Sequence, residues 1–247
     1  MSVRAVAALL AVASGCGRLG FAPIAGDAGG DSGDSTPPIS LELPAGGRTW
    51  IGLNVLPAED GYFASSIAFI GARAFVGTYR RVLVADPPYT TWTPHQIMGA
   101  NREVFAVAVT GGKLWAGTED GLFVSADQAM TFQAVPQVSV LVEALLVLPD
   151  GGLAAATGGG TWLSDAATAT WALRGPAEYT YKHALIPGGL VAATEDGAFV
   201  SRDRGLTWAL APGSETYTVP SAIYDRGTGE LVIGTIGAGL VRVPLPP

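Results

Sequence analysis

One short pattern recurs five times along most of this chain. In each copy an apolar run ends in a threonine, a polar or glycine-rich turn follows, and a second apolar run comes next. The threonines are Thr78, Thr118, Thr157, Thr194 and Thr235, so the intervals between them are 40, 39, 37 and 41 residues. A repeat of this length cannot bury its apolar faces alone, so the copies must stack against one another.

Each copy predicts four short antiparallel strands. In the second copy we expect strands at 104–109, 114–118, 122–125 and 131–135, joined by short segments rich in Gly or Asp, as hairpins require. The strands are nearly continuous apolar runs, which is typical of sheets covered on both faces. Five such units predict an all-β fold over residues 41–247, a five-bladed β-propeller of four-stranded antiparallel blades.

The last copy lacks a fourth strand, whereas a spare strand precedes the first copy. The segment GRTWIGL, at 47–53, resembles the GLTW at 205–208. We therefore expect residues 48–53 to pair with the strand around 239–243, as the outer strand of the last blade. Such closure by the N-terminal strand would remove the unpaired edges of an open stack.

The turn SRDRGLTW, at 201–208, connects the expected third and fourth strands of the fourth copy. Its Asp can cap backbone N–H groups, its Gly can supply a positive φ, and its Trp can be buried between blades. The turn resembles the Asp-box of BNR or sialidase-like propellers. The matching residues are Ser201, Asp203, Gly205, Thr207 and Trp208.

Weaker copies of the turn support the same fold. The segment SADQAMTF, at 125–132, keeps the Ser, Asp, Thr and aromatic types, and two other copies keep mainly the terminal Thr-Trp. The repeats are also similar to those of photosystem-assembly-factor propellers. We expect the aromatics that end the four turns to be largely buried at equivalent positions. They are Trp92, Phe132, Trp171 and Trp208.

The N-terminal segment predicts export. Arg4 is followed by the apolar run 5–13 and small residues, a signal-peptide pattern over residues 1–15 that is too short to span a membrane. Cys16, the chain's single cysteine, follows Ala-Ser-Gly, which resembles the lipobox of bacterial lipoproteins, although Ala13 stands where that family usually has Leu. The resemblance implies lipidation of Cys16 and a place in the bacterial cell envelope; an ordinary signal peptide is the alternative. Residues 16–40 predict a disordered tether.

Composition narrows the function classes. The chain has 14 Lys and Arg against 21 Asp and Glu, a net charge of −7, and no basic patch, which argues against nucleic acid. No metal-spaced histidine pair or zinc cysteine set is present, so we predict no metal and no cofactor. We expect a monomer that meets the membrane only through its lipid anchor.

A binding face is expected at one end of the blades. Propeller ligands usually meet the loops that join the fourth strand to the first and the second to the third, and loops on a rigid scaffold carry function. Here those loops hold most of the tyrosines, both histidines and several carboxylates; the alternative is that they are simply solvated. The candidate residues are Tyr62, Arg80, Arg81, His95, Arg102, Glu119, Tyr181, His183, Glu195 and Tyr217.

The sequence therefore leaves two functions open. The first is a non-catalytic binding or scaffold module for a glycan or a cell-envelope protein, with no catalytic residue. The second is a carbohydrate-active hydrolase. Sialidases use three arginines, a Tyr–Glu pair and an Asp acid/base, but they usually have six blades and an Arg-Ile-Pro motif that this sequence lacks. Another glycosidase would need two carboxyl groups about 5–10 Å apart. The carboxyl candidates are Asp60, Glu103, Glu119, Asp120, Glu195 and Asp196.

Overall fold

The structure, a computed structural model, describes residues 40–41, 50–51, 64–97, 103–176 and 178–246. Within these ranges every regular element is a β-strand. Among the same residues there is no helix with the length and apolar character needed to cross a membrane. The predicted signal segment, Cys16, Tyr62 and Arg102 lie outside the described residues.

The repeat forms five antiparallel sheets, four of four strands and a last one of three. The first two sheets are β3 (Ala64–Ile70), β4 (Arg73–Thr78), β5 (Val82–Ala85) and β6 (Thr93–His95), then β7 (Val104–Thr110), β8 (Lys113–Thr118), β9 (Gly121–Ser125) and β10 (Gln133–Ala134). The next two are β11 (Val142–Val147), β12 (Leu153–Thr157), β13 (Gly160–Ser164) and β14 (Trp171–Leu173), then β15 (Thr180–Ile186), β16 (Gly189–Thr194), β17 (Gly197–Ser201) and β18 (Ala209–Leu210). The last is β19 (Ser221–Asp225), β20 (Glu230–Thr235) and β21 (Gly239–Val243).

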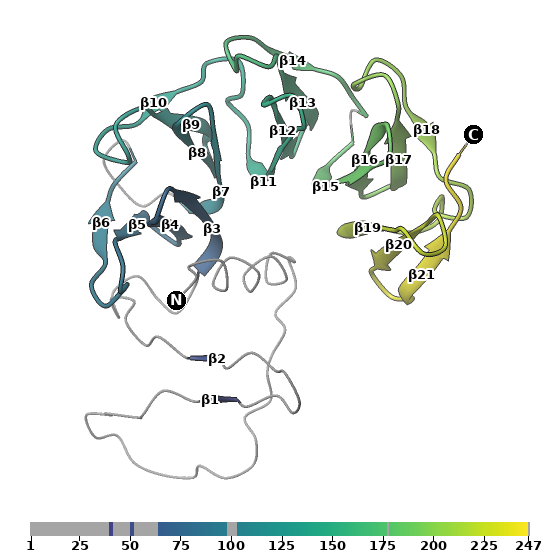
Figure 1. Cartoon of the computed structure of the whole chain (residues 1–247). Coiled ribbons are helices and arrows are strands. Elements are labelled where there is room, and N and C mark those ends of the chain that lie inside the picture. Colours follow the sequence, from purple (N-terminus) through teal and green to yellow (C-terminus); the bar gives the residue numbers. More distant parts are fainter. Residues whose placement is uncertain (1–39, 42–49, 52–63, 98–102, 177, 247) are drawn as a thin grey trace.

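The five sheets follow one another along an arc (Figure 1), with β3, β7, β11, β15 and β19 on its inner side. Each of the first four inner strands packs against the inner strand of the next sheet. Apolar residues of neighbouring sheets share one buried cluster at each boundary, as Phe75 and Leu114 do between the first two sheets. The expectation of an all-β fold is confirmed, and the architecture is consistent with a β-propeller.

The predicted closure by the N-terminal strand is wrong in this structure. Instead of joining residues 239–243, β2 (Trp50–Ile51) pairs antiparallel with β1 (Ser40–Leu41). Among the described residues β21 pairs only with β20, so the last sheet keeps three strands and the arc is not closed. Pairing two nearby segments costs less loop-closure entropy than pairing opposite ends of the domain, which favours the local partner.

The recurrent threonine closes the turn after the second strand of each sheet. In the fourth sheet the Thr194 Oγ1 donates to the carbonyl oxygen of Gly197 at 2.9 Å, and the Asp196 N–H donates to the Thr194 Oγ1 at 3.2 Å. The corresponding hydroxyls of the other four threonines also donate to a turn carbonyl three or four residues ahead. A hydroxyl both donates and accepts, which Val could not do in the same volume.

Glycine before the threonine lets two neighbouring sheets approach closely. A Cβ at Gly117 would lie 2.6 Å from the Cγ1 of Val142 and 3.0 Å from its carbonyl oxygen, on the inner strand of the next sheet. At Gly77 a Cβ would lie 3.1 Å from the carbonyl oxygen of Val104. The second strand of one sheet therefore touches the first strand of the next through bare backbone.

Aspartate organises the turn between the third and fourth strands. The Asp203 carboxylate accepts the Thr207 N–H at 2.9 Å and the Thr207 hydroxyl at 2.6 Å, while the Ser201 hydroxyl donates to it at 2.9 Å. Gly205 has a φ of 79° and its N–H donates to the Ser201 Oγ at 2.7 Å. Asp127 makes the same set of bonds in the turn at 125–132.

The aromatic that ends each turn is buried to different depths in the four sheets. Phe132 and Trp171 are each 8% exposed, and Trp92 and Trp208 are partly buried. All four aromatics are therefore mostly buried, as expected, but Trp92 and Trp208 are less deeply buried than the other two. The Trp208 indole N–H donates to the carbonyl oxygen of Arg174 at 2.8 Å.

Candidate functional site

A group of acidic and tyrosine side chains gathers where the inner strands begin. Backbone pairing sets the positions: the Glu119 N–H donates to the carbonyl oxygen of Glu103 at 3.3 Å, and the Glu195 N–H donates to that of Tyr179 at 3.1 Å. These bonds extend the ladder between the first and second strands of the second and fourth sheets by one step. We call the group the acidic face. Its members are Glu103, Glu119, Glu143, Tyr179, Tyr181 and Glu195.

The acidic face crosses the boundary between the third and fourth sheets. The Tyr179 hydroxyl donates a short hydrogen bond to the Glu143 carboxylate, which lies 36 residues earlier on β11. The rings of Tyr179 and Tyr181 lie 4.8 Å apart between centroids, at an interplanar angle of 44°. Both tyrosines are half-buried, so their positions are constrained while part of each ring meets solvent.

β-bulges place two of these side chains. The register of β11 against β12 shifts between Val142 and Ala144, which leaves Glu143 as the extra residue. The register of β15 against β16 shifts in the same way around Tyr181. A bulge leaves one residue without a ladder partner and re-aims its side chain, and bulges are frequent beside functional sites.

Two neighbouring carboxylates of the acidic face affect the pKa of Glu103. Burial, followed by the charges of Glu119 and Glu143, raises the pKa of Glu103 above its ordinary value. Like charges close together disfavour further negative charge. The face is therefore suited to a neutral or cationic partner, and its oxygens accept hydrogen bonds from hydroxyl or ammonium groups.

The structure brings together only some of the residues predicted for a ligand. Glu119, Tyr181 and Glu195 belong to the acidic face. Arg80 and Arg81 lie in the turn after β4 at the same end of the first sheet, where the Arg80 guanidinium stands 5.8 Å from the centroid of the Tyr79 ring. Asp120 and Asp196 lie in the exposed turns after β8 and β16.

The other predicted residues do not join the acidic face. His95 ends β6, the outermost strand of the first sheet, and burial together with the charge of Arg73 lowers its pKa. Tyr217 packs against the apolar core of the last two sheets. His183 lies on the inner strand β15, far along the arc from His95, so the two histidines do not form a pair.

His183 is half-buried, and its imidazole is held neutral. Its Nε2 lies 3.0 Å from the hydroxyl of Thr161, a fully buried residue on β13. Its Nδ1 is buried and has no hydrogen-bond partner among the described residues. Burial lowers the pKa of His183 to about 3. The side chain is part of the boundary between the third and fourth sheets.

Sequence reasoning missed Glu143 and Tyr179. A signal for Glu143 was present, because it is the only charged residue in the otherwise apolar stretch VLVEALLVLP at 140–149. A lone charge in an inner strand is costly unless a partner or solvent receives it. Within the described residues no group of three or more His, Cys, Asp or Glu side chains is placed to hold a metal ion.

Comparisons with known proteins identify a fold and no family. No protein-family model matches the chain, and no curated protein is significantly similar to it. The extracellular domain of the putative hybrid two-component system BT3049 from B. thetaiotaomicron matches with a TM-score of 0.60 at 19% identity, over 74% of this chain and 27% of that one. The corresponding domain of BT4673, from the same organism, matches with a TM-score of 0.58 at 16% identity, over 74% and 26%.

A third solved structure matches over a larger share of both chains. YCF48 bound to a D1 peptide matches with a TM-score of 0.58 at 12% identity, over 85% of this chain and 68% of that one. This chain spans only 26% and 27% of the length of the two extracellular domains. These neighbours are β-propeller-like, and at such low identities the likeness concerns the fold: this chain has an all-β, propeller-like architecture.

Proposed function

We propose that this protein is an exported, non-catalytic binding module that recognises a glycan at its acidic face. The observation that carries the proposal is the tyrosine pair held against Glu143 of the neighbouring sheet. Aromatic rings offer flat apolar surface to the C–H face of a sugar, and fixed carboxylates accept hydrogen bonds from its hydroxyls. The neighbouring carboxylates favour a neutral or amino sugar over an acidic one.

The wider architecture belongs to the same proposal. The five sheets are the blades of a five-bladed propeller of the Asp-box type, and Cys16 carries the lipid that anchors the chain in the envelope. The likeness in fold to extracellular domains of bacterial sensor systems supports export.

The lipid anchor can be tested directly. Intact-mass analysis of membrane-extracted protein should find a lipidated Cys16 as the mature N-terminus, and Cys16→Ala should release the protein from membranes. An unmodified Cys16 in a soluble mature form would contradict the anchor.

Binding can be tested by titration calorimetry with three oligosaccharides of different charge. We expect neutral chitohexaose and a cationic chitosan oligomer to bind more tightly than anionic sialyllactose. Tyr181→Ala and Glu143→Gln should weaken binding at least about tenfold, because each removes a group that meets the sugar. Tyr89→Phe is the matched control, since the Tyr89 hydroxyl makes one hydrogen bond to Ala72 at the opposite end of the first sheet. Preferential binding of sialyllactose would overturn the proposal.

A second ligand class is suggested by the third structural neighbour. YCF48 was solved with a D1 peptide, so a peptide of an envelope protein is the alternative occupant for the same scaffold. Failure of all three oligosaccharides to bind, together with capture of one defined envelope protein that Tyr181→Ala abolishes, would favour this alternative.

A glycoside hydrolase is the second candidate function, favoured by the Tyr179–Glu143 hydrogen bond and by the raised pKa of Glu103. A carboxylate beside a tyrosine can accept its proton and activate it as a nucleophile, while a carboxyl group of raised pKa can act as a general acid. Turnover of 4-methylumbelliferyl glycosides that is lost in Tyr179→Phe and Glu143→Gln, with sugar binding retained, would establish the enzyme.

A further inference from the structure

A cavity of about 650 Å³ opens at the opposite end of the third, fourth and fifth sheets. It lies beside the turns between β11 and β12, between β15 and β16, and between β19 and β20, whereas the acidic face lies where the inner strands begin. The length of the antiparallel strands separates the two ends. The cavity is therefore a site of its own, and binding there does not depend on the function proposed for the acidic face.

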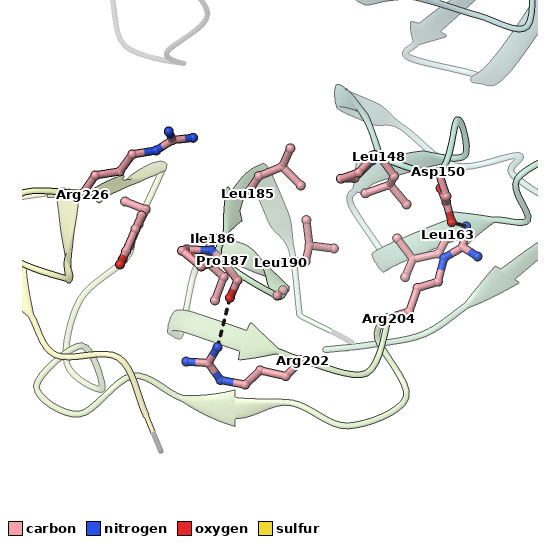
Figure 2. Close-up of a pocket in the computed structure, with 14 residues that line it drawn as sticks. Leu148, Asp150, Leu163, Leu185, Ile186, Pro187, Leu190, Arg202, Arg204 and Arg226 are labelled. Atoms are coloured by element: carbon pink, nitrogen blue, oxygen red, sulfur yellow. Dashed lines mark hydrogen bonds and ion pairs between the residues drawn. The ribbon is translucent and has the colours of Figure 1, made fainter.

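The floor of the cavity is apolar and well packed. Leu148, Leu163 and Leu190 line it and are between 4% and 8% exposed, as members of one buried cluster between the third and fourth sheets. Leu185, which also lines the cavity, is 41% exposed. Figure 2 shows Leu185 and Leu190 on one side of the cavity and Leu148 and Leu163, next to Asp150 and Arg204, on the other. A hydrocarbon group placed here would cover exposed apolar surface.

Three arginines stand around the floor, although the chain as a whole is acidic. Arg204 is neutralised, because its Nη2 lies 2.8 Å from the Asp150 carboxylate and also donates to the carbonyl oxygen of Ser164. Arg202 donates only to the carbonyl oxygen of Pro187, at 3.2 Å, and no carboxylate of the described residues pairs with it or with Arg226. Two exposed guanidinium groups therefore keep donors available for a ligand.

We propose that this cavity binds an amphipathic anion, a small molecule with a hydrocarbon body and one carboxylate or phosphate group. The body lies against Leu148, Leu163 and Leu190, and the anion is held by Arg202 and Arg226. Guanidinium groups match carboxylate and phosphate oxygens in geometry and charge. The volume falls in the range of small-molecule sites, about 300–1,000 Å³, so a small ligand fits better than a protein surface.

The turn between the third and fourth strands carries arginines in the fourth sheet but not in the second. Arg202 and Arg204 occupy two of the three variable positions of the turn SRDRGLTW, where the equivalent turn of the second sheet has Ala126 and Gln128. The hydrogen bonds that shape the turn come from Ser201, Asp203 and Thr207, so positions 202 and 204 are free to carry a binding function.

Calorimetric titration of the full chain with four ligands separates the two parts of the proposal. Decanoate and decyl phosphate carry both chain and charge, decanol lacks the charge, and acetate lacks the chain. We expect decanol and acetate to bind at least about tenfold more weakly than the better of the two anions, and binding of that anion to weaken with added salt. Whichever of decanoate and decyl phosphate binds more tightly identifies the head group.

Variants locate the site. Arg202→Gln and Arg226→Gln should each weaken decanoate binding about tenfold, and Leu185→Gln should weaken decanoate and decanol alike. Lys113→Gln is the control, because Lys113 is an exposed cation at the same end of the second sheet. Since both arginines are exposed, a melting curve close to that of the wild type is expected for each variant. The proposal is overturned if neither anion binds at millimolar concentration, if decanol binds as tightly as the better of the two anions, or if the variant that combines Arg202→Gln and Arg226→Gln binds that anion like the wild type.

Discussion

At the scale of single residues, the aspartates of the turns are the most strongly perturbed acids. Hydrogen bonds from the hydroxyl and the N–H of Thr207 lower the pKa of Asp203 to about 2, and Thr131 does the same for Asp127. Hydrogen bonds from Thr170 and Ala169 lower the pKa of Asp165, although its turn is one residue out of step with the motif. The carboxylate is thus kept as a cap even where the sequence pattern has decayed.

The hydrogen-bonded aspartates of these turns predict that the stability of the fold decreases in acid. Above a pH of about 4, where an unfolded Asp is ionised, the bonds to Asp203 stabilise the fold in full; the stabilisation is lost as the pH falls through about 2. Asp203→Asn should therefore melt at a lower temperature than the wild type at pH 7, and the difference should shrink toward pH 2.5. Asp196→Asn, in an exposed turn of the same sheet, is the control. A difference that does not change with pH would contradict this origin.

His183 predicts a second pH effect at higher pH. The folded protein keeps the imidazole neutral down to a pH of about 3, whereas an unfolded His binds a proton near a pH of about 6.5. The unfolded chain then binds more protons, so stability falls as the pH drops below about 6.5. In urea unfolding, His183→Leu should flatten the dependence between pH 6.5 and 5. His95→Leu serves as the comparison, because the chain has only two histidines; an equal slope in wild type and His183→Leu would refute the assignment.

At the scale of the elements, the threonine that closes each β-turn explains why the repeat is visible in the sequence. Thr194→Val would leave the Gly197 carbonyl and the Asp196 N–H without their buried partner. We expect a loss of about 1–3 kcal/mol in the free energy of unfolding. Thr235→Val removes equivalent bonds at a partly exposed position and should cost less. Equal losses in chemical denaturation would show that burial does not set the cost.

Glycine at the sheet boundary gives a further test at this scale. Gly117→Val should destabilise the protein by about 1–3 kcal/mol, because the new side chain would overlap Val142 of the next sheet. Gly159→Ala is the control, since nothing lies within 4 Å of a Cβ at that position. Thermal melting distinguishes the two, and a Gly117→Val variant as stable as the wild type would mean that the boundary can open without cost.

Local patterns predicted the elements well and their partners poorly. In the second copy, strands expected at 104–109, 114–118 and 122–125 are found as β7, β8 and β9 with ends shifted by a residue, because hairpin residues and apolar runs are local signals. The contact of Glu143 with Tyr179 joins different sheets and depends on a bulge, neither of which periodicity encodes. The partner of β2 was missed because a two-residue strand carries little information on where it pairs.

At the scale of the whole molecule, extensive contacts within the described residues run from each sheet to the next along the arc. Among the residues that the structure describes, the first and last sheets do not pack extensively against each other, so each has one neighbouring sheet where the middle three have two. In such nearest-neighbour arrays, stability is close to a sum of units and interfaces.

The open arc therefore implies an uneven time course of isotope exchange. Local opening of an end sheet breaks one interface, while opening of the third sheet breaks two, so backbone amides should exchange with deuterium fastest in β19–β21 and slowest in β11–β13. Mass spectrometry of peptides after a deuterium pulse would show the gradient. A molecule built in this way loosens from its ends inward, so the backbone amides of β11, the strand that carries Glu143, would be among the last to exchange.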